Sequence, residues 1–192
     1  GTNNAYVDMD LTVKVGDTTT YTYYTYKIPA KAMKGKWYEG SSTTEMTDKQ
    51  IADVTTPKDV KRGSDGVEPY TYTFDLKLSD ANPKGAESGA ESKEYKDNNA
   101  SFKITPRNVT LTSATDSKEY DGNPLTNDKI TEGGDGFVKG EGATYAVTGS
   151  QTTVGESNNT FNYTLNNNTK ASNYTITTEL GKLTITKKAE VL

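Results

Sequence analysis

The chain has 192 residues, a net charge of -4 and a pI of about 5.0, and it contains neither cysteine nor histidine. A disulfide framework, a thiol nucleophile, a histidine general base and nearly all zinc or copper sites are therefore excluded. The acidic balance argues against nucleic acid as a partner, and no apolar run is long enough for membrane insertion.

The low hydrophobic content, 31% of the residues, predicts two small cores in place of one large core. Disorder is the competing interpretation, but the apolar residues recur with period two, as in half-buried strands. We expect a mostly β chain of two tandem small domains, with at most one short helix in the first. The predicted domains are residues 1–105 and 106–187, and residues 188–192 begin a following repeat or linker.

The first predicted elements are two strands joined by a turn at Gly16-Asp17. Alternation predicts the first strand over residues 7–15. The second is rich in tyrosine and stops before Pro29. Its apolar phase switches between Tyr23 and Tyr24, which suggests a β-bulge or a strand covered on both faces.

A single short helix is predicted after residues 30–46, which have the composition of a loop. Thr47 and Gln50 form a capping box, and Pro57 ends a helix of about two turns. Strands are predicted over residues 70–78 and 102–104. The intervening residues 80–99 are expected to form an exposed loop.

The second half of the chain has shorter strands, at 109–111, 145–147, 161–165, 174–176 and 183–185. Turns are predicted at residues 121–124, 132–136 and 166–168, where Gly and Asn gather. Segments 101–105 and 182–186 share the pattern x-Φ-x-Ile-Thr with an offset of 182 − 101 = 81 residues, which is the size of a domain. The dipeptides Pro106-Arg107 and Lys187-Lys188 are interpreted as linkers, so residues 189–192 would begin a third unit.

Several motifs of residues 107–187 follow one another in a recognisable order. They are Lys-Glu-Tyr-Asp-Gly-Asn-Pro-Leu at 118–125, Gly-Phe-Val-Lys-Gly at 136–140, Gly-Ser-Gln-Thr-Thr-Val-Gly at 149–155, and Ala-Ser-Asn-Tyr-Thr-Ile-Thr at 171–177 before Gly-Lys-Leu-Thr-Ile-Thr at 181–186. In these motifs the segment resembles the YDG-type MBG repeat domains of bacterial surface adhesins. The resemblance implies a β-grasp-like fold in a secreted, wall-attached protein. Residues 1–105 match only at their end and are interpreted as a divergent relative.

The candidate ligand-binding residues are aromatic: Tyr24, Tyr26, Trp37 and Tyr38. Such side chains on a flat strand face can stack on sugar rings and hydrogen-bond their hydroxyls. The alternative is that strands simply favour aromatic residues. Trp37 is the strongest single candidate because it falls in a predicted loop.

Other site chemistries have weaker signals. Asp121 and Gly122 are expected to form a tight turn with Tyr120 packed as an anchor. No acidic pair sits in a catalytic motif, so we expect no catalytic residue, no cofactor and no metal site. Calcium at residues 63–66 or 134–136 is less favoured than a solvated turn. An isopeptide bond between a lysine and an asparagine stays open.

These features predict a non-catalytic, extracellular stalk or adhesion module of a bacterial cell-surface repeat protein. Its partners would be neighbouring repeats in the same chain and a host glycoprotein or glycan. One alternative is a dedicated glycan- or mucin-binding module. The other is an accessory domain of a large secreted enzyme.

Overall fold

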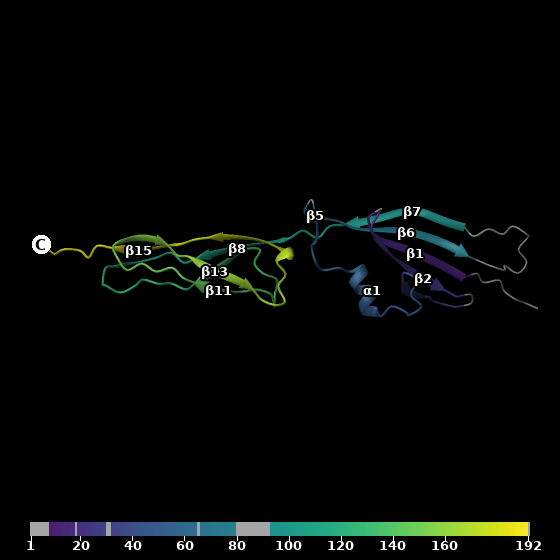
Figure 1. The fold of residues 1–192 in the computed structure, drawn as a ribbon, viewed down its shortest axis with the longest axis horizontal. Coiled ribbons are helices and arrows are strands. Elements are labelled where there is room, and N and C mark those ends of the chain that lie inside the picture. Colours follow the sequence, from purple (N-terminus) through teal and green to yellow (C-terminus); the bar gives the residue numbers. More distant parts are fainter. Residues whose placement is uncertain (1–7, 18, 30–31, 65, 80–92, 192) are drawn as a thin grey trace, which may run out of the picture. The chain divides into compact units, whose positions relative to one another are not determined.

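The computed structural model describes residues 8–17, 19–29, 32–64, 66–79 and 93–191, and for residues 8, 76–79 and 93–97 it describes the backbone (Figure 1). The chain is mostly β, as predicted, with one α-helix in the described residues. It divides into two compact units, unit 1 (Gly1–Ile104) and unit 2 (Thr105–Leu192).

Unit 1 is built on a five-stranded antiparallel sheet with the order β3-β2-β1-β6-β7. Its strands are β1 (Asp8–Gly16), β2 (Tyr21–Ile28), β3 (Lys36–Glu39), β6 (Tyr70–Ser79) and β7 (Lys93–Phe102). The predicted strands over 7–15 and 70–78 are confirmed, although Val7 lies outside the described residues. A small hairpin of β4 (Lys61–Gly63) and β5 (Gly66–Glu68) was not anticipated.

The tyrosine-rich strand β2 contains no bulge against β1. The pairing runs without interruption from Met9 opposite Ile28 to Gly16 opposite Tyr21. The change of phase therefore divides the tyrosines between the two faces of the sheet, since successive side chains of a strand alternate. The register shift of this sheet lies elsewhere, between β6 and β7 at Phe74.

The predicted helix is α1 (Asp48–Thr55), and its capping box is present. The backbone N–H of Gln50 donates to Thr47 Oγ1 at 3.2 Å, and the N–H of Thr47 donates to Gln50 Oε1 at 2.8 Å. The helix is held to the sheet through Tyr72, whose hydroxyl donates to the Val54 carbonyl at 2.7 Å. This bond ties the end of α1 to the first part of β6.

The prediction of a loop over residues 80–99 is wrong for its last part, because β7 begins at Lys93. These residues are polar and lack alternation, so nothing local identifies them as a strand. They pair with β6, and Thr73 Oγ1 donates to Asn99 Oδ1 across the two strands at 2.9 Å. β7 ends at Phe102, so Ile104 lies beyond it. Residues 80–92 are outside the described part of the chain.

Unit 2 contains short strands in three small sheets, with the orders β10-β8-β14, β12-β15-β9 and β11-β13. The five strands predicted here are all present, and β9, β10 and β12 were not anticipated. The elements are β8 (Arg107–Ser113), β9 (Asp116–Glu119), β10 (Ile130–Gly134), β11 (Ala143–Val147), β12 (Gly155–Asn158), β13 (Phe161–Leu165), the 3-10 turn η1 (Ala171–Asn173), β14 (Tyr174–Glu179) and β15 (Lys182–Thr186).

Two local predictions in unit 2 are wrong. Arg107 is not part of a linker but opens β8, and its guanidinium donates to the carbonyls of Asp135 at 2.6 Å and Gly136 at 2.7 Å. The turn predicted at 132–136 begins later, because Gly133 and Gly134 belong to β10 and pair with β8. In both cases strand pairing with residues distant in sequence overrides what the local sequence indicates.

Two long tracks run through unit 2 in parallel. β14 pairs with β8, and β15 pairs with β9. The same offset of 67 residues separates Tyr174 from Arg107 and Leu183 from Asp116. Segments 107–119 and 174–186 therefore keep a single register and are interrupted only at residues 114–115 and 180–181.

Side chains bridge this interruption in place of strand pairing. Ser113 Oγ donates to the carbonyl of Asn159 at 2.6 Å and accepts from the N–H of Gly181 at 2.9 Å. The N–H of Asn159 donates in turn to the Gly181 carbonyl at 2.8 Å. We call Ser113, Asn159 and Gly181 the junction. Ser113 is 2% exposed and Asn159 is fully buried, so these bonds satisfy groups that water cannot reach.

Two further features explain why asparagine and glycine occupy positions 159 and 181 of the junction. Asn159 Nδ2 donates to the carbonyls of Ala114 at 3.0 Å and Asn127 at 2.9 Å. A Cβ atom on Gly181 would lie 2.3 Å from the Ala114 carbonyl oxygen, which is closer than any side chain can approach. A small apolar core lies on each side: Val109, Leu111 and Tyr174 on one, and Leu125, Leu183 and Ile185 on the other.

We predict that Asn159→Ala destabilises unit 2 by about 2–4 kcal/mol, because it leaves two part-buried carbonyls without the donor that a fully buried side chain supplies. Hydrogen exchange of the β8 and β15 amides in the full chain measures this loss. The control is Asn158→Ala at the neighbouring exposed position, which should cost less than about 0.5 kcal/mol. Equal protection in the two variants would show that the junction does not stabilise the unit.

Candidate functional site

The four predicted aromatic residues come together on β2 and β3, but they divide between the two faces of the sheet. Tyr26 lies opposite Trp37 in the register, and their ring centroids are 5.1 Å apart. Tyr24 lies on the same face, two residues along β2. Tyr38 lies opposite Thr25 and therefore belongs to the other face.

The sequence predicts a loop at Trp37, but this residue belongs to β3. Lys36–Glu39 is too short to show alternation, and it becomes a strand because it pairs with β2. Its carbonyl also accepts the N–H of Met46 at 2.8 Å, which turns the chain back toward α1. The prediction of an exposed loop at Trp37 is therefore wrong.

The inner face, which carries Tyr24, Tyr26 and Trp37, is turned toward α1. Between this face and the helix lies a cavity of about 300 Å³. Its walls are almost entirely apolar: Val13, Tyr24, Trp37, Met46, Ile51, Val54, Thr55, Tyr72, Phe74, Ala100 and Phe102. The inner face therefore does not offer the open aromatic platform on which a sugar ring stacks.

Tyr26 has a structural role in this cluster. Its hydroxyl accepts the backbone N–H of Gly35 at 2.8 Å, which holds the connection between β2 and β3. A Cβ on Gly35 would lie 2.3 Å from the Lys27 carbonyl oxygen, so the connection passes close to β2. The aromatic pair of Tyr26 and Trp37 thus packs the end of the hairpin.

The outer face of β2 carries two exposed tyrosine side chains. Tyr21 is 45% exposed and Tyr23 is 39% exposed, and Tyr38 lies on this face beside them. Lys14 Nζ lies 4.9 Å from the Tyr21 ring centroid, and Lys27 Nζ lies 5.7 Å from that of Tyr38. The sequence signal for this face was the alternation along β2, which places Tyr21 and Tyr23 on one face of the strand and Tyr24 and Tyr26 on the other.

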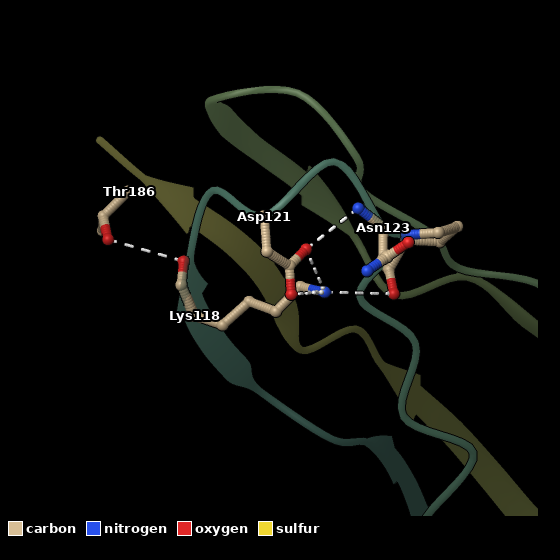
Figure 2. Close-up of polar contacts among 5 residues, drawn as sticks. Lys118, Asp121, Asn123 and Thr186 are labelled. Carbon is tan, nitrogen blue, oxygen red and sulfur yellow. Dashed lines mark hydrogen bonds and ion pairs between the residues drawn. The ribbon is translucent and has the colours of Figure 1, made fainter. Parts of the chain in front are cut away.

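The Tyr-Asp-Gly motif forms the expected tight turn in unit 2 (Figure 2). Gly122 has a φ of 80°, and Asp121 Oδ1 accepts the N–H of Asn123 at 2.9 Å. The Lys118 ammonium lies 3.0 Å from the same carboxylate and also reaches the Pro124 carbonyl. Tyr120 does not pack as an anchor, because it is 49% exposed; it is held by its backbone, whose N–H donates to the Thr186 carbonyl.

The contacts of Lys118 bear on the isopeptide bond that the sequence leaves open. Its ammonium faces a carboxylate and not an asparagine amide. The Asn123 N–H and then Lys118 hold the pKa of Asp121 below its usual value, so the carboxylate stays charged. An ion pair of this kind is a surface clasp on the turn, since half of the Asp121 side chain is exposed.

The pKa shifts of the described residues move away from neutrality. Burial raises the pKa of Tyr24, with a smaller contribution from Glu39, and burial also raises that of Tyr72. The N–H groups of Thr20 and Thr19 lower the pKa of Asp17.

The described residues hold no group of three or more acidic side chains placed to bind a metal ion. Of the two loops weighed for calcium, Asp65 lies outside the described part. Asp135 uses its carbonyl to accept Arg107. No helix in the part of the chain that the structure describes is long and apolar enough to cross a membrane.

Comparison with known proteins gives no match to a family model, to a curated protein or to a solved structure.

We predict that the Asp121 clasp stabilises unit 2 in a pH-dependent way. The folded pKa of Asp121 lies below the ordinary value of 3.8, so its contribution is present above that value and is lost as the pH falls through the folded pKa. Asp121→Asn should therefore lower the melting temperature at pH 7, and this difference should disappear at strongly acidic pH. Asp128→Asn, at an exposed position of the same unit, is the control for thermal unfolding followed by circular dichroism.

Proposed function

We propose that the chain is a non-catalytic, load-bearing stalk or adhesion module of a bacterial cell-surface repeat protein, outside the cell. One observation carries the proposal: the path of the chain through unit 2. The chain enters at Arg107, the first residue of β8, and leaves at Thr186, the last residue of β15 (Figure 1). In the register of the two tracks, Arg107 lies opposite Tyr174, whereas Thr186 lies opposite Glu119.

Entry and exit are therefore at opposite ends of two adjacent parallel tracks. Thirteen residues of strand span up to roughly 40 Å, so a short sequence covers a long distance. Tension between the two ends would slide the tracks along each other. All hydrogen bonds between the tracks would then be loaded together, whereas strands pulled apart from one end would open pair by pair.

The other supports are chemical and come from the sequence. The absence of cysteine and histidine removes most catalytic and metal chemistry. The resemblance of residues 107–187 to YDG-type MBG repeats, with its β-grasp-like fold, places the module in a wall-attached protein next to further repeats. These points stay predictions, as does the two-domain boundary at residues 105 and 106.

We predict that unit 2 resists force strongly only along its natural path. Single-molecule pulling of the full chain from residues 107 and 186 loads the tracks in shear. Pulling from residues 119 and 186, which are paired neighbours, opens them one pair at a time. The chain has no cysteine, so cysteines introduced at these positions give unique attachment points.

The expected result is a several-fold higher unfolding force along the natural path, because forced unfolding depends on the barrier that the loaded bonds create. Asn159→Ala should lower this force and leave the force from residues 119 and 186 nearly unchanged. Equal and low forces in both geometries would contradict a load-bearing role.

A second candidate function is the binding of a glycan or mucin by the outer face of unit 1. The observation that favours it is the exposure of Tyr21 and Tyr23 next to Tyr38, with two lysine ammonium groups beside them. Aromatic faces with polar tips suit the stacking of sugar rings. The predicted ligand residue that this face retains is Tyr38.

Glycan-array and mucin binding by the full chain tests this second function. Tyr23→Ala and Tyr38→Ala should each reduce binding by about tenfold, which corresponds to about 1.4 kcal/mol. Trp37→Ala is the matched control on the inner face. Loss of binding with Trp37→Ala alone would place the sugar on the inner face and overturn the assignment.

A further inference from the structure

The cavity of unit 1 points to a ligand site that is independent of the proposed stalk function. We propose that it binds a small, neutral aromatic molecule of about two fused rings, held between the inner face of the sheet and α1. Size, chemistry and access lead to this assignment. All lining residues belong to unit 1.

The size of the cavity sets the size of the ligand. An apolar cavity of about 150 Å³ in another protein stays dry and binds benzene. The cavity below α1 measures about 300 Å³, twice that volume. Two fused aromatic rings therefore match the space, whereas a single ring would leave part of it empty.

The chemistry of the cavity walls determines the chemical class of the ligand. The described lining residues carry no charged side chain, so an ion would lose its hydration without compensation. Aromatic rings from four strands, Tyr24, Trp37 and Tyr72 among them, surround the space, and Met46 adds a thioether. Rings and sulfur both form favourable contacts with an aromatic guest.

The burial of the walls indicates the direction of access. Val13 and Tyr72 are 7% and 8% exposed, so they form the closed end. Phe102 is 42% exposed and Ala100 is also exposed, and both lie on the edge strand β7. The mouth of the cavity is therefore at β7.

The helix α1, which covers the cavity, is held in place by hydrogen bonds at its two ends and not by a side-chain face packed against the sheet. No residue of α1 is buried, although Ile51 and Val54 line the cavity. The capping box orders its first turn, and Tyr72 holds the Val54 carbonyl. The helix therefore keeps its position over an unfilled space, whose walls forgo dispersion contacts that a guest would restore.

The only tryptophan of the chain lines this cavity, so its fluorescence reports on the site alone. The test is titration of the full chain with N-phenyl-1-naphthylamine, a neutral dye whose emission rises in apolar surroundings. We expect a saturable rise, energy transfer from Trp37 to the dye, and displacement by naphthalene. Trp37→Phe should abolish the transfer and keep the binding.

Two variants fill the cavity from opposite walls. Val54→Phe acts from the helix and Ala100→Phe from the mouth at β7, and each should weaken dye binding at least about tenfold. Asp53→Ala, on the solvent side of the same helix, is the matched control and should bind as the original chain does. Circular dichroism checks that each variant is folded; if Val54→Phe does not fold, Ala100→Phe decides.

Two results would overturn the proposal. One is the absence of saturable binding by the original chain, with filling variants that raise the melting temperature, since the cavity would then be a packing defect of a thin core. The other is undiminished dye binding in the folded filling variants, which would place the dye elsewhere. Neither result bears on the pulling experiment, which loads unit 2.

Discussion

The architecture of unit 2 depends on one buried asparagine. Its two parallel tracks cannot pair where residues 114–115 pass residues 180–181, and backbone groups that lose a partner inside a protein are costly. Asn159 supplies the missing bonds from a third segment: its backbone joins Ser113 and Gly181, and its amide reaches two more carbonyls. The junction lets the strand pairs on either side of it keep a single register. Each pair has its own small core, so unit 2 is long without a large core.

Unit 1 meets the same shortage of apolar residues in another way. One sheet and one short helix cannot fill the space between them, and a cavity remains at their interface. Tyr26, whose ring packs against Trp37 of the cavity wall, has a structural role, because its hydroxyl holds the backbone of Gly35. The shortage of apolar residues is thus met by two small cores in unit 2, and it leaves an unfilled cavity in unit 1.

Both proposals follow from these two solutions. Tracks that begin and end at opposite ends of unit 2 suit the transmission of tension. The division of the tyrosines of β2 gives the sheet of unit 1 two different faces. Tyr21 and Tyr23 are exposed on the outer face, while Tyr24 lines the apolar cavity on the inner face.

The sequence by itself determined the features that depend on neighbours in the chain. Alternation predicted β1 and β6, the capping box of Thr47 and Gln50 predicted α1, and Asp121-Gly122 predicted a turn, because each signal acts within a few residues. Tertiary structure alone decided the rest. The strands β3, β7 and β10 form because other strands pair with them. Arg107 belongs to β8 and not to the predicted linker, and carbonyls 28 and 29 residues away accept hydrogen bonds from its guanidinium. Trp37 was placed in the wrong environment for the same reason: whether a side chain meets solvent, a helix or a cavity depends on contacts between segments, which local pattern does not encode.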